Sequence, residues 1–126
     1  MSASVTVDLV TYDAKRDAFV LVVVEEGPWP VEETNANLRR LKDKLSACVD
    51  AAVDGGVAQK FPDSAGKLVV IRLDCYDTPQ DQSEQLLFRV AEYVHSSAHI
   101  RCAVAEKRYV SGLEFEFNWR SVKNDA

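Results

Sequence analysis

The strictest pattern in the chain is an alternation of apolar and polar residues near its C-terminal end. The apolar members are Leu113, Phe115, Phe117 and Trp119, and the polar members are Glu114, Glu116 and Asn118. A period of two predicts a β-strand, because successive side chains of a strand point to opposite faces of the sheet. This strand has one face in water, so a second layer of structure must cover its apolar face.

Four other segments are predicted to be strands. Residues 4–12 alternate between apolar and polar side chains, whereas residues 18–26 are nearly all apolar and are rich in β-branched side chains. The second pattern predicts a strand that is covered on both faces. The polar segment 13–17 joins the two strands in an antiparallel hairpin. Residues 68–75 and 100–104 are predicted to form a third and a fourth strand, before the C-terminal one.

Two helices are predicted between these strands. Apolar residues recur at helical spacing over residues 32–54, and the Gly-Gly pair at 55–56 ends that helix. A second apolar stripe lies on residues 80–97, where Thr78 is the expected N-cap and Pro79 the first helical residue.

The predicted order of elements is therefore ββαβαββ. This order predicts an α+β fold with a single antiparallel or mixed sheet and two helices packed on one face of it. The chain of 126 residues is expected to form one domain, with residues 121–126 as a polar tail.

The composition limits the classes of function. The chain is 47% hydrophobic and 28% charged, which is typical of a globular protein. Its net charge of −5 argues against nucleic acid as a partner. It lacks an apolar run of membrane-spanning length and a recognisable secretory signal, so neither a membrane partner nor export is expected. A cytoplasmic protein is predicted.

Three cysteines support the same compartment. Cys48, Cys75 and Cys102 are odd in number and lie in apolar segments, which predicts three buried thiols in a reducing cytosol. Cys102 alternates with Ile100 and Val104 and is therefore expected to face the core. No pair of cysteines has the spacing of a zinc site, and neither a metal nor a cofactor is predicted.

Catalytic patterns are weak. The chain has no Gly-x-Ser-x-Gly motif, and His95 and His99 are its only histidines. Their four-residue spacing suits two metal ligands on a helix, but a third ligand is missing from the pattern, and solvated side chains near a helix end are the simpler interpretation. A small enzyme that uses paired carboxylates or His95 remains the least favoured hypothesis.

Several short segments resemble an uncharacterised family of small bacterial proteins. They are Val-Asp-Leu-Val-Thr-Tyr-Asp at 7–13, Val-Glu-Glu-Gly-Pro-Trp at 24–29, Ala-Gly-Lys at 65–67 and Ile-Arg-Leu-Asp-Cys-Tyr at 71–76. The resemblance covers about residues 5–105 and is that of a domain of unknown function. It implies a bacterial cytosolic protein of α+β fold and brings no catalytic residues.

The favoured hypothesis is a non-enzymatic protein-binding module, in concrete form an acidic immunity-type protein that masks a basic partner. Trp29 lies between two prolines in an acidic stretch, a pattern that suits an aromatic anchor with electrostatic steering. The candidate partner-binding residues are Trp29, Glu25, Glu26, Glu32, Glu33, Asp74 and Asp77. The alternative for Trp29 is a side chain folded back over the sheet edge or a helix.

Two further patterns have simple alternatives. The basic run formed by Arg39, Arg40, Lys42 and Lys44 is expected to be the solvated face of the first helix. The aromatic residues of the C-terminal strand suggest a second hypothesis, a self-associating structural domain. If that strand lies at the edge of the sheet, two copies can pair across a two-fold axis and form a homodimer.

Overall fold

The computed structural model describes residues 8–106 and 109–122. In chain order, the elements are β1 (Leu9–Asp13), β2 (Ala18–Glu26), the 3-10 turn η1 (Val31–Glu33), α1 (Thr34–Val53), α2 (Gly56–Lys60), the 3-10 turn η2 (Pro62–Ser64), β3 (Lys67–Tyr76), α3 (Gln80–Ser96), α4 (Ala98–Ala105) and β4 (Val110–Arg120).

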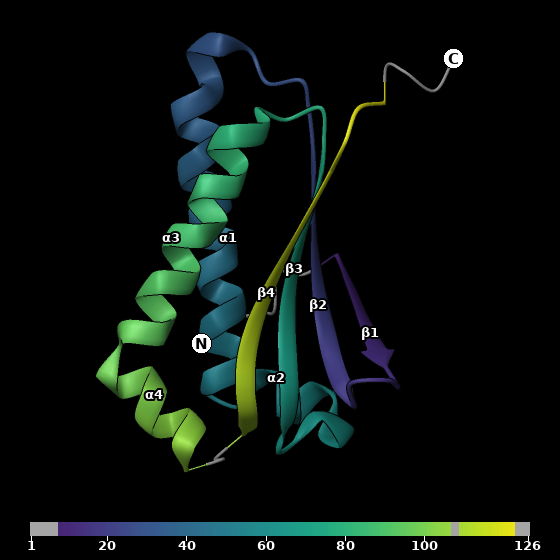
Figure 1. Cartoon of the computed structure of the whole chain (residues 1–126), viewed down its shortest axis with the longest axis vertical. Helices are drawn as coiled ribbons and strands as arrows, with labels where there is room; N and C mark the ends of the chain where they lie inside the picture. Colours follow the sequence, from purple (N-terminus) through teal and green to yellow (C-terminus); the bar gives the residue numbers. More distant parts are fainter. Residues whose placement is uncertain (1–7, 107–108, 123–126) are drawn as a thin grey trace.

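The four strands form one mixed sheet in the order β1-β2-β3-β4. β1 and β2 form the expected antiparallel hairpin, while β2, β3 and β4 run parallel to one another. Both parallel connections step in the same direction across the sheet, so a shared right-handed crossover places their helices on the same face. Figure 1 shows α1 and α3 side by side on that face, with β4 and β1 at the two edges of the sheet. The predicted α+β class and mixed sheet are thus confirmed.

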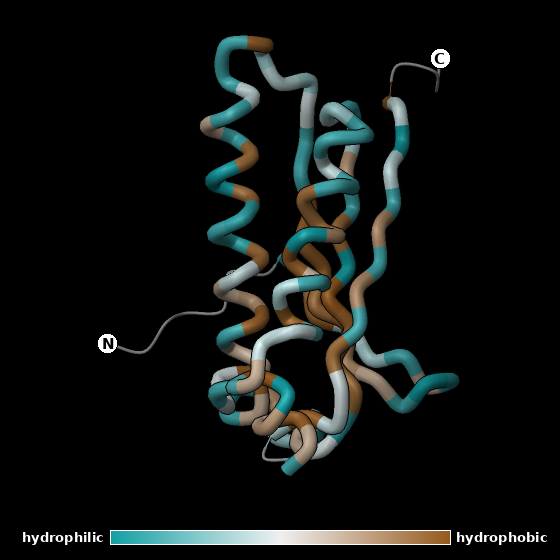
Figure 2. The backbone as a smooth tube through the Cα atoms, turned by 60° about the vertical axis from the view of Figure 1, so that its left-hand side comes forward, coloured by the Kyte–Doolittle hydropathy of each residue, from teal (hydrophilic) through white to brown (hydrophobic). Residues whose placement is uncertain are grey.

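The main core lies between the sheet and the helices. Leu21 and Val23 of β2 and Ile71 of β3 face Leu41 and Leu45 of α1, and all five are buried. The hydrophobic colour in Figure 2 accordingly gathers on the middle of the sheet. The nearly all-apolar β2 is buried on both faces, as its sequence predicts.

The helix-free face of the sheet carries a smaller buried cluster of four residues. They are Ala18, Val20, Val22 and Val70.

One predicted strand is wrong. Residues 100–104 belong to the helix α4, so the order of the main elements is ββαβααβ rather than ββαβαββ. The hydroxyl of Ser97 accepts a hydrogen bond from the amide of Ile100 at 3.4 Å and caps this helix. Ile100 and Ala103 are buried at helical spacing. Cys102 is therefore exposed instead of buried, which corrects the expectation of three buried thiols.

The boundaries of the other elements follow the sequence closely. Gly55 ends α1 in the left-handed conformation, with φ of 94°, as the Gly-Gly pair predicts. The cap of α3 differs by one position, because Pro79 is the N-cap residue and the Thr78 hydroxyl pairs with Ser83 instead. Residues 4–7 of the predicted first strand, and 123–126 of the predicted tail, lie outside the described residues.

Candidate functional site

The carboxyl ends of β2, β3 and β4 lie together at one end of the sheet, which is where parallel sheets commonly bind ligands. In this protein, groups of the chain itself contact one another there. The amide of Gly27 donates to the carbonyl of Tyr76 at 2.6 Å. A Cβ atom on Gly27 would collide with the carbonyl of Asp77, and Nε1 of Trp119 donates to the carbonyl of Thr78 at 2.8 Å. Hydrogen bonds therefore join the loops at this end of the sheet to one another.

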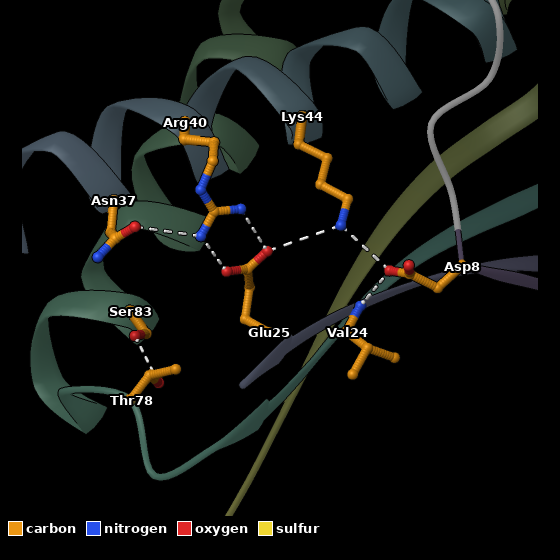
Figure 3. A network of polar contacts seen from close by, with 8 residues as sticks. All are labelled: Asp8, Val24, Glu25, Asn37, Arg40, Lys44, Thr78 and Ser83. Atoms are coloured by element: carbon orange, nitrogen blue, oxygen red, sulfur yellow. Dashed lines mark hydrogen bonds and ion pairs between the residues drawn. The ribbon is translucent and has the colours of Figure 1, made fainter. Parts of the chain in front are cut away.

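Glu25 is the buried charge at this end of the sheet, with 4% of its surface exposed. The guanidinium of Arg40 on α1 donates to both of its carboxylate oxygens, at 3.0 and 2.6 Å, and Nζ of Lys44 lies 3.6 Å away (Figure 3). This hydrogen-bonded partnership raises the pKa of Arg40. Glu25 is held as an ion pair that fixes α1 to β2, so it lacks the arrangement of a general acid.

Lys44 extends the network to the start of the described chain. Its Nζ donates to Asp8 at 3.2 Å, and the same carboxylate accepts the amide of Val24 at 2.7 Å (Figure 3). Partial burial raises the pKa of Asp8, but these two donors outweigh it and the pKa lies below its ordinary value. The network joins α1, β2 and the residue before β1, which is a structural role.

The two buried thiols are poorly suited to nucleophilic chemistry. Burial raises the pKa of Cys48 to about 11. Burial also raises the pKa of Cys75, although the nearby hydroxyls of Thr78 and Ser83 partly oppose this effect. Both thiols therefore stay protonated near neutral pH, whereas a nucleophilic cysteine reacts as the thiolate. The part of the chain that the structure describes contains no group of three or more residues placed to hold a metal ion.

The predicted partner-binding residues near Trp29 separate into two environments. Trp29 is half-buried and packs against the main core, and Glu25 is buried in its ion pair. Glu26, Glu32 and Glu33 are exposed. Next to them lies Val31, which no sequence pattern singles out and which is 88% exposed. The apolar side chain presented beside these acids is thus Val31.

The other two predicted residues of this set serve the sheet itself. Asp74 lies on the helix-free face, where it accepts a hydrogen bond from Asn118 at 3.1 Å and lies 3.2 Å from Nε of Arg72. Asp77 has a positive φ of 61°, and its carboxylate accepts the amide of Val122 at 3.2 Å. The two aspartates therefore hold the end of β4 in place.

The basic run on α1 is divided as well. Arg40 and Lys44 face the buried Glu25, while Arg39 and Lys42 are exposed as expected for a solvated helix face. The spacing of Arg40 and Lys44 by four residues places both on the side of the helix that meets β2. The prediction of a wholly solvated run is thus wrong for Lys44, which is half-buried, whereas Arg40 pairs with Glu25 and still has 51% of its side chain exposed.

The two histidines do not share a helix. His95 lies on α3, where its Nε2 is 3.3 Å from the carbonyl oxygen of Leu113 and its ring meets Phe115 edge-on at 6.0 Å. His99 lies on α4 and is exposed. Their spacing of four residues therefore does not bring them to one helix face.

A groove of about 830 Å³ runs between α3 and β4. Apolar side chains line it, among them Leu87, Phe88, Ala91, Phe115 and Phe117. Three acids also line it, and they are Glu84, Glu92 and Glu114.

Sequence reasoning selected the aromatic residues of β4 but missed those of α3. Phe88 and Tyr93 are 61% and 68% exposed beside the groove. Both lie outside the apolar, core-facing stripe of their helix. Aromatic residues in such positions could have indicated an exposed binding surface from the sequence alone.

The groove follows the free side of a long edge strand. β4 has 11 residues and pairs with β3 on one side, and no strand of residues 8–106 and 109–122 pairs with its other side. We call this surface the α3–β4 edge and define it by Phe88, Tyr93, Phe115, Phe117 and the outer side of β4. It is an exposed strand edge beside a strip of aromatic side chains.

The fold and these surfaces define a small α+β protein in which Glu25, Asp74 and Asp77, at the carboxyl ends of the parallel strands, are paired with groups of the same chain. The chain belongs to the family of unknown function DUF6572, which matches residues 1–106. β4 therefore lies beyond the matched residues.

No curated protein and no solved structure matches the chain. Among the described residues, no helix has the length and apolar character that crossing a membrane requires.

Proposed function

We propose that this protein is a non-enzymatic protein-binding module and that the α3–β4 edge is its contact surface. The exposed aromatic side chains of Phe88 and Tyr93, beside the groove and a free strand edge, carry this proposal. Contiguous exposed apolar surface on a small protein is typical of a protein-interaction site. A free strand edge offers backbone donors and acceptors to a partner in the same place.

A second candidate surface supports a basic partner. We define the acidic tip as Glu26, Val31, Glu32 and Glu33, which surround the start of α1. Its exposed Val31 offers apolar contact among acids that would steer a basic surface. In this form the protein is an acidic, immunity-type module that masks a basic partner.

A cytoplasmic location belongs to the same proposal. The cysteines of the described chain are free thiols, and one of them, Cys102, is exposed, which suits a reducing compartment.

One capture experiment distinguishes the two surfaces. The tagged wild-type protein, the variant Phe88→Lys/Tyr93→Lys and the variant Val31→Lys are each used to capture two purified proteins, the product of the neighbouring gene and the untagged chain itself. All three positions are largely exposed, so the variants are expected to fold like the wild type. Circular dichroism and thermal unfolding check this.

If the α3–β4 edge is the contact surface, the double variant loses capture and Val31→Lys keeps it. If the acidic tip is the contact surface, Val31→Lys loses capture, and capture by the wild type weakens as salt rises. Failure of the wild type to capture either protein at low salt contradicts the function proposed here.

A further inference from the structure

We infer that the partner at the α3–β4 edge is a second copy of this chain, joined by antiparallel pairing of two β4 strands about a two-fold axis at Phe117. This inference rests on the proposed function and names its partner. It makes one continuous sheet of eight strands from the four strands of each copy.

The two edge strands of the sheet, β1 and β4, differ in length. β1 has five residues, and β4 has 11. Natural edge strands are commonly protected by proline, lysine or short length, and residues 110–120 contain neither proline nor lysine. β4 is therefore the edge that is long enough and open enough to accept another strand.

The symmetry restricts how two β4 strands can pair. A two-fold axis perpendicular to the sheet makes the strands antiparallel and keeps the helices of both copies on the same face. Residues directly opposite then share a face of the sheet. With Phe117 opposite itself, Phe115 lies opposite Trp119 on the helix-facing side.

The polar side of β4 selects this register by charge. With Phe117 at the axis, Glu114 of each copy lies opposite Arg120 of the other, and Glu116 lies opposite Asn118. The pair of Glu114 with Arg120 occurs twice because of the symmetry. Opposite charges directly across two strands stabilise their pairing.

The two nearest registers on the N-terminal side of Phe117 oppose like charges. An axis at Phe115 places Glu114 opposite Glu116, and an axis at Glu116 places that glutamate opposite itself. Like charges directly across two strands are destabilising. Neither register provides the match that an axis at Phe117 provides.

The register on the C-terminal side of Phe117 is shorter. An axis at Asn118 pairs residues 116–120 of β4, whereas an axis at Phe117 pairs residues 114–120. It also relies on Glu116, which Nη1 of Arg16 already contacts at 2.8 Å. The axis at Phe117 therefore gives the longest overlap with complementary charges.

The contact of His95 fits the limit of this register. Its Nε2 lies 3.3 Å from the carbonyl oxygen of Leu113, the residue directly before the paired stretch 114–120. The His95 side chain therefore contacts the carbonyl oxygen of Leu113 just outside the stretch that pairs, and the proposed pairing does not need that carbonyl oxygen.

The inferred dimer also covers apolar surface. Phe115, Phe117 and Trp119 are only half-buried in the single chain, and the pairing makes one continuous aromatic row from both copies. The axis at Phe117 brings the two grooves next to each other, with the exposed Phe88 of each copy beside them. Burial of aromatic surface supplies most of the stabilisation in such interfaces.

The rival partner is a basic extended segment of another protein. Glu84 and Glu92 line the same groove and would favour it. We prefer the second copy because the register gives Glu114 a partner within the same sequence. The experiment below separates the two.

The test uses charge reversal with sedimentation velocity over a wide range of protein concentration. The wild type is expected to form dimers. Glu114→Arg and Arg120→Glu each place like charges opposite at two symmetric positions, so each is expected to weaken dimerisation about tenfold or more. The combined variant Glu114→Arg/Arg120→Glu restores opposite charges and is expected to recover the wild-type affinity.

Mixing the two single variants gives a sharper result. In a mixed dimer, both arginines of one chain face both glutamates of the other, so the mixture is expected to dimerise although each variant alone does not. Thermal unfolding of the single variants confirms that they are folded. Arg120 and Glu114 are both exposed, which favours this.

A disulfide cross-link tests the register. In a Cys102→Ser background, which removes the exposed native thiol, Phe117→Cys is expected to form a covalent dimer on oxidation because residue 117 lies opposite itself. The matched variant Phe115→Cys lies opposite Trp119 and is expected to cross-link far less.

A wild type that stays monomeric at every concentration overturns the inference, as does efficient cross-linking at residue 115 rather than 117. The proposed function survives a monomeric result if the α3–β4 edge still captures the product of the neighbouring gene. Loss of that capture in Phe88→Lys/Tyr93→Lys then assigns the edge to the rival partner.

Discussion

Glu25 and Glu26 are neighbours in the sequence, yet the strand gives them opposite environments. Side chains alternate along β2, so Glu25 turns toward α1 and is buried, while Glu26 is exposed. Glu25 is stable there because Arg40, on a different element, supplies two hydrogen bonds. The sequence could not distinguish these two acids, because the partner of Glu25 is fixed only by the packing of α1 on the sheet.

The three thiols are expected to react at very different rates. Cys102 is exposed on α4, while Cys48 and Cys75 are buried. We therefore expect a thiol reagent to label one cysteine rapidly in the native protein and all three after unfolding. Mass spectrometry of the labelled protein locates the first site. Rapid labelling of Cys48 in the native protein would contradict the packing of α1.

Cys48 is also expected to make stability depend on pH under alkaline conditions. Its pKa in the folded protein is about 11, against 9.0 for a free thiol. A group whose pKa is raised by folding stabilises the fold below its unfolded pKa, and this contribution is lost as pH rises. Between about pH 9 and pH 11, ionisation of Cys48 is expected to cost about 2 to 3 kcal/mol.

Denaturant unfolding of the wild type and of Cys48→Ala at several pH values measures this effect. The variant is expected to lose less stability over that interval, although Cys75 and other groups still titrate. Cys102→Ala is the matched control for the loss of a cysteine side chain, because its thiol is exposed rather than buried. If the free energy of unfolding changes with pH equally in the wild type and in Cys48→Ala, the thiol of Cys48 does not ionise in a buried site.

At the scale of the elements, the contact between α1 and β2 depends on Arg40. Arg40→Ala leaves the carboxylate of Glu25 buried with only Lys44 at 3.6 Å, so the free energy of unfolding is expected to fall by about 1 to 3 kcal/mol. The neighbouring Arg39→Ala is the control, because Arg39 is exposed and its loss should change stability by less than about 0.5 kcal/mol. Urea unfolding measures both changes in stability. Equal effects of the two substitutions would show that the ion pair between Arg40 and Glu25 does not stabilise the protein.

Elements with a strong periodic pattern were predictable from the sequence. β4 follows strict alternation, and α1 and α3 follow helical spacing with recognisable ends. The helix α4 was missed because Ile100, Cys102 and Val104 also fit a period of two. Ser97 as a cap and the alanines at 98, 103 and 105 favour a helix, and eight residues are too few for either pattern to decide alone.

The candidate contact surface was only half predictable. The alternation of β4 identifies Phe115 and Phe117, but not whether the strand lies at an edge, since the order of strands is a tertiary property. Phe88 and Tyr93 join them only because α3 packs beside β4. The acidic tip was found by composition, whereas the exposure of Val31 and the partial burial of Trp29 needed the structure.

At the scale of the whole molecule, association is expected to appear as a thermal stability that depends on concentration. A dimer that forms from the folded chain raises the unfolding midpoint by mass action, so a hundredfold increase in concentration should raise it by a few degrees. Arg120→Glu should shift much less over the same range. Differential scanning fluorimetry or calorimetry measures the shift, and a wild-type midpoint that is independent of concentration contradicts self-association.

The position of β4 in the chain has a consequence for synthesis. Residues 110–120 are made after every other described strand, yet they pair with the whole length of β3. A nascent chain that has not reached residue 120 has the helices and three strands, but β3 then lacks its second neighbour. Folding of the complete sheet must therefore wait until translation has passed β4, and a ribosome-bound chain exposes β3 until then.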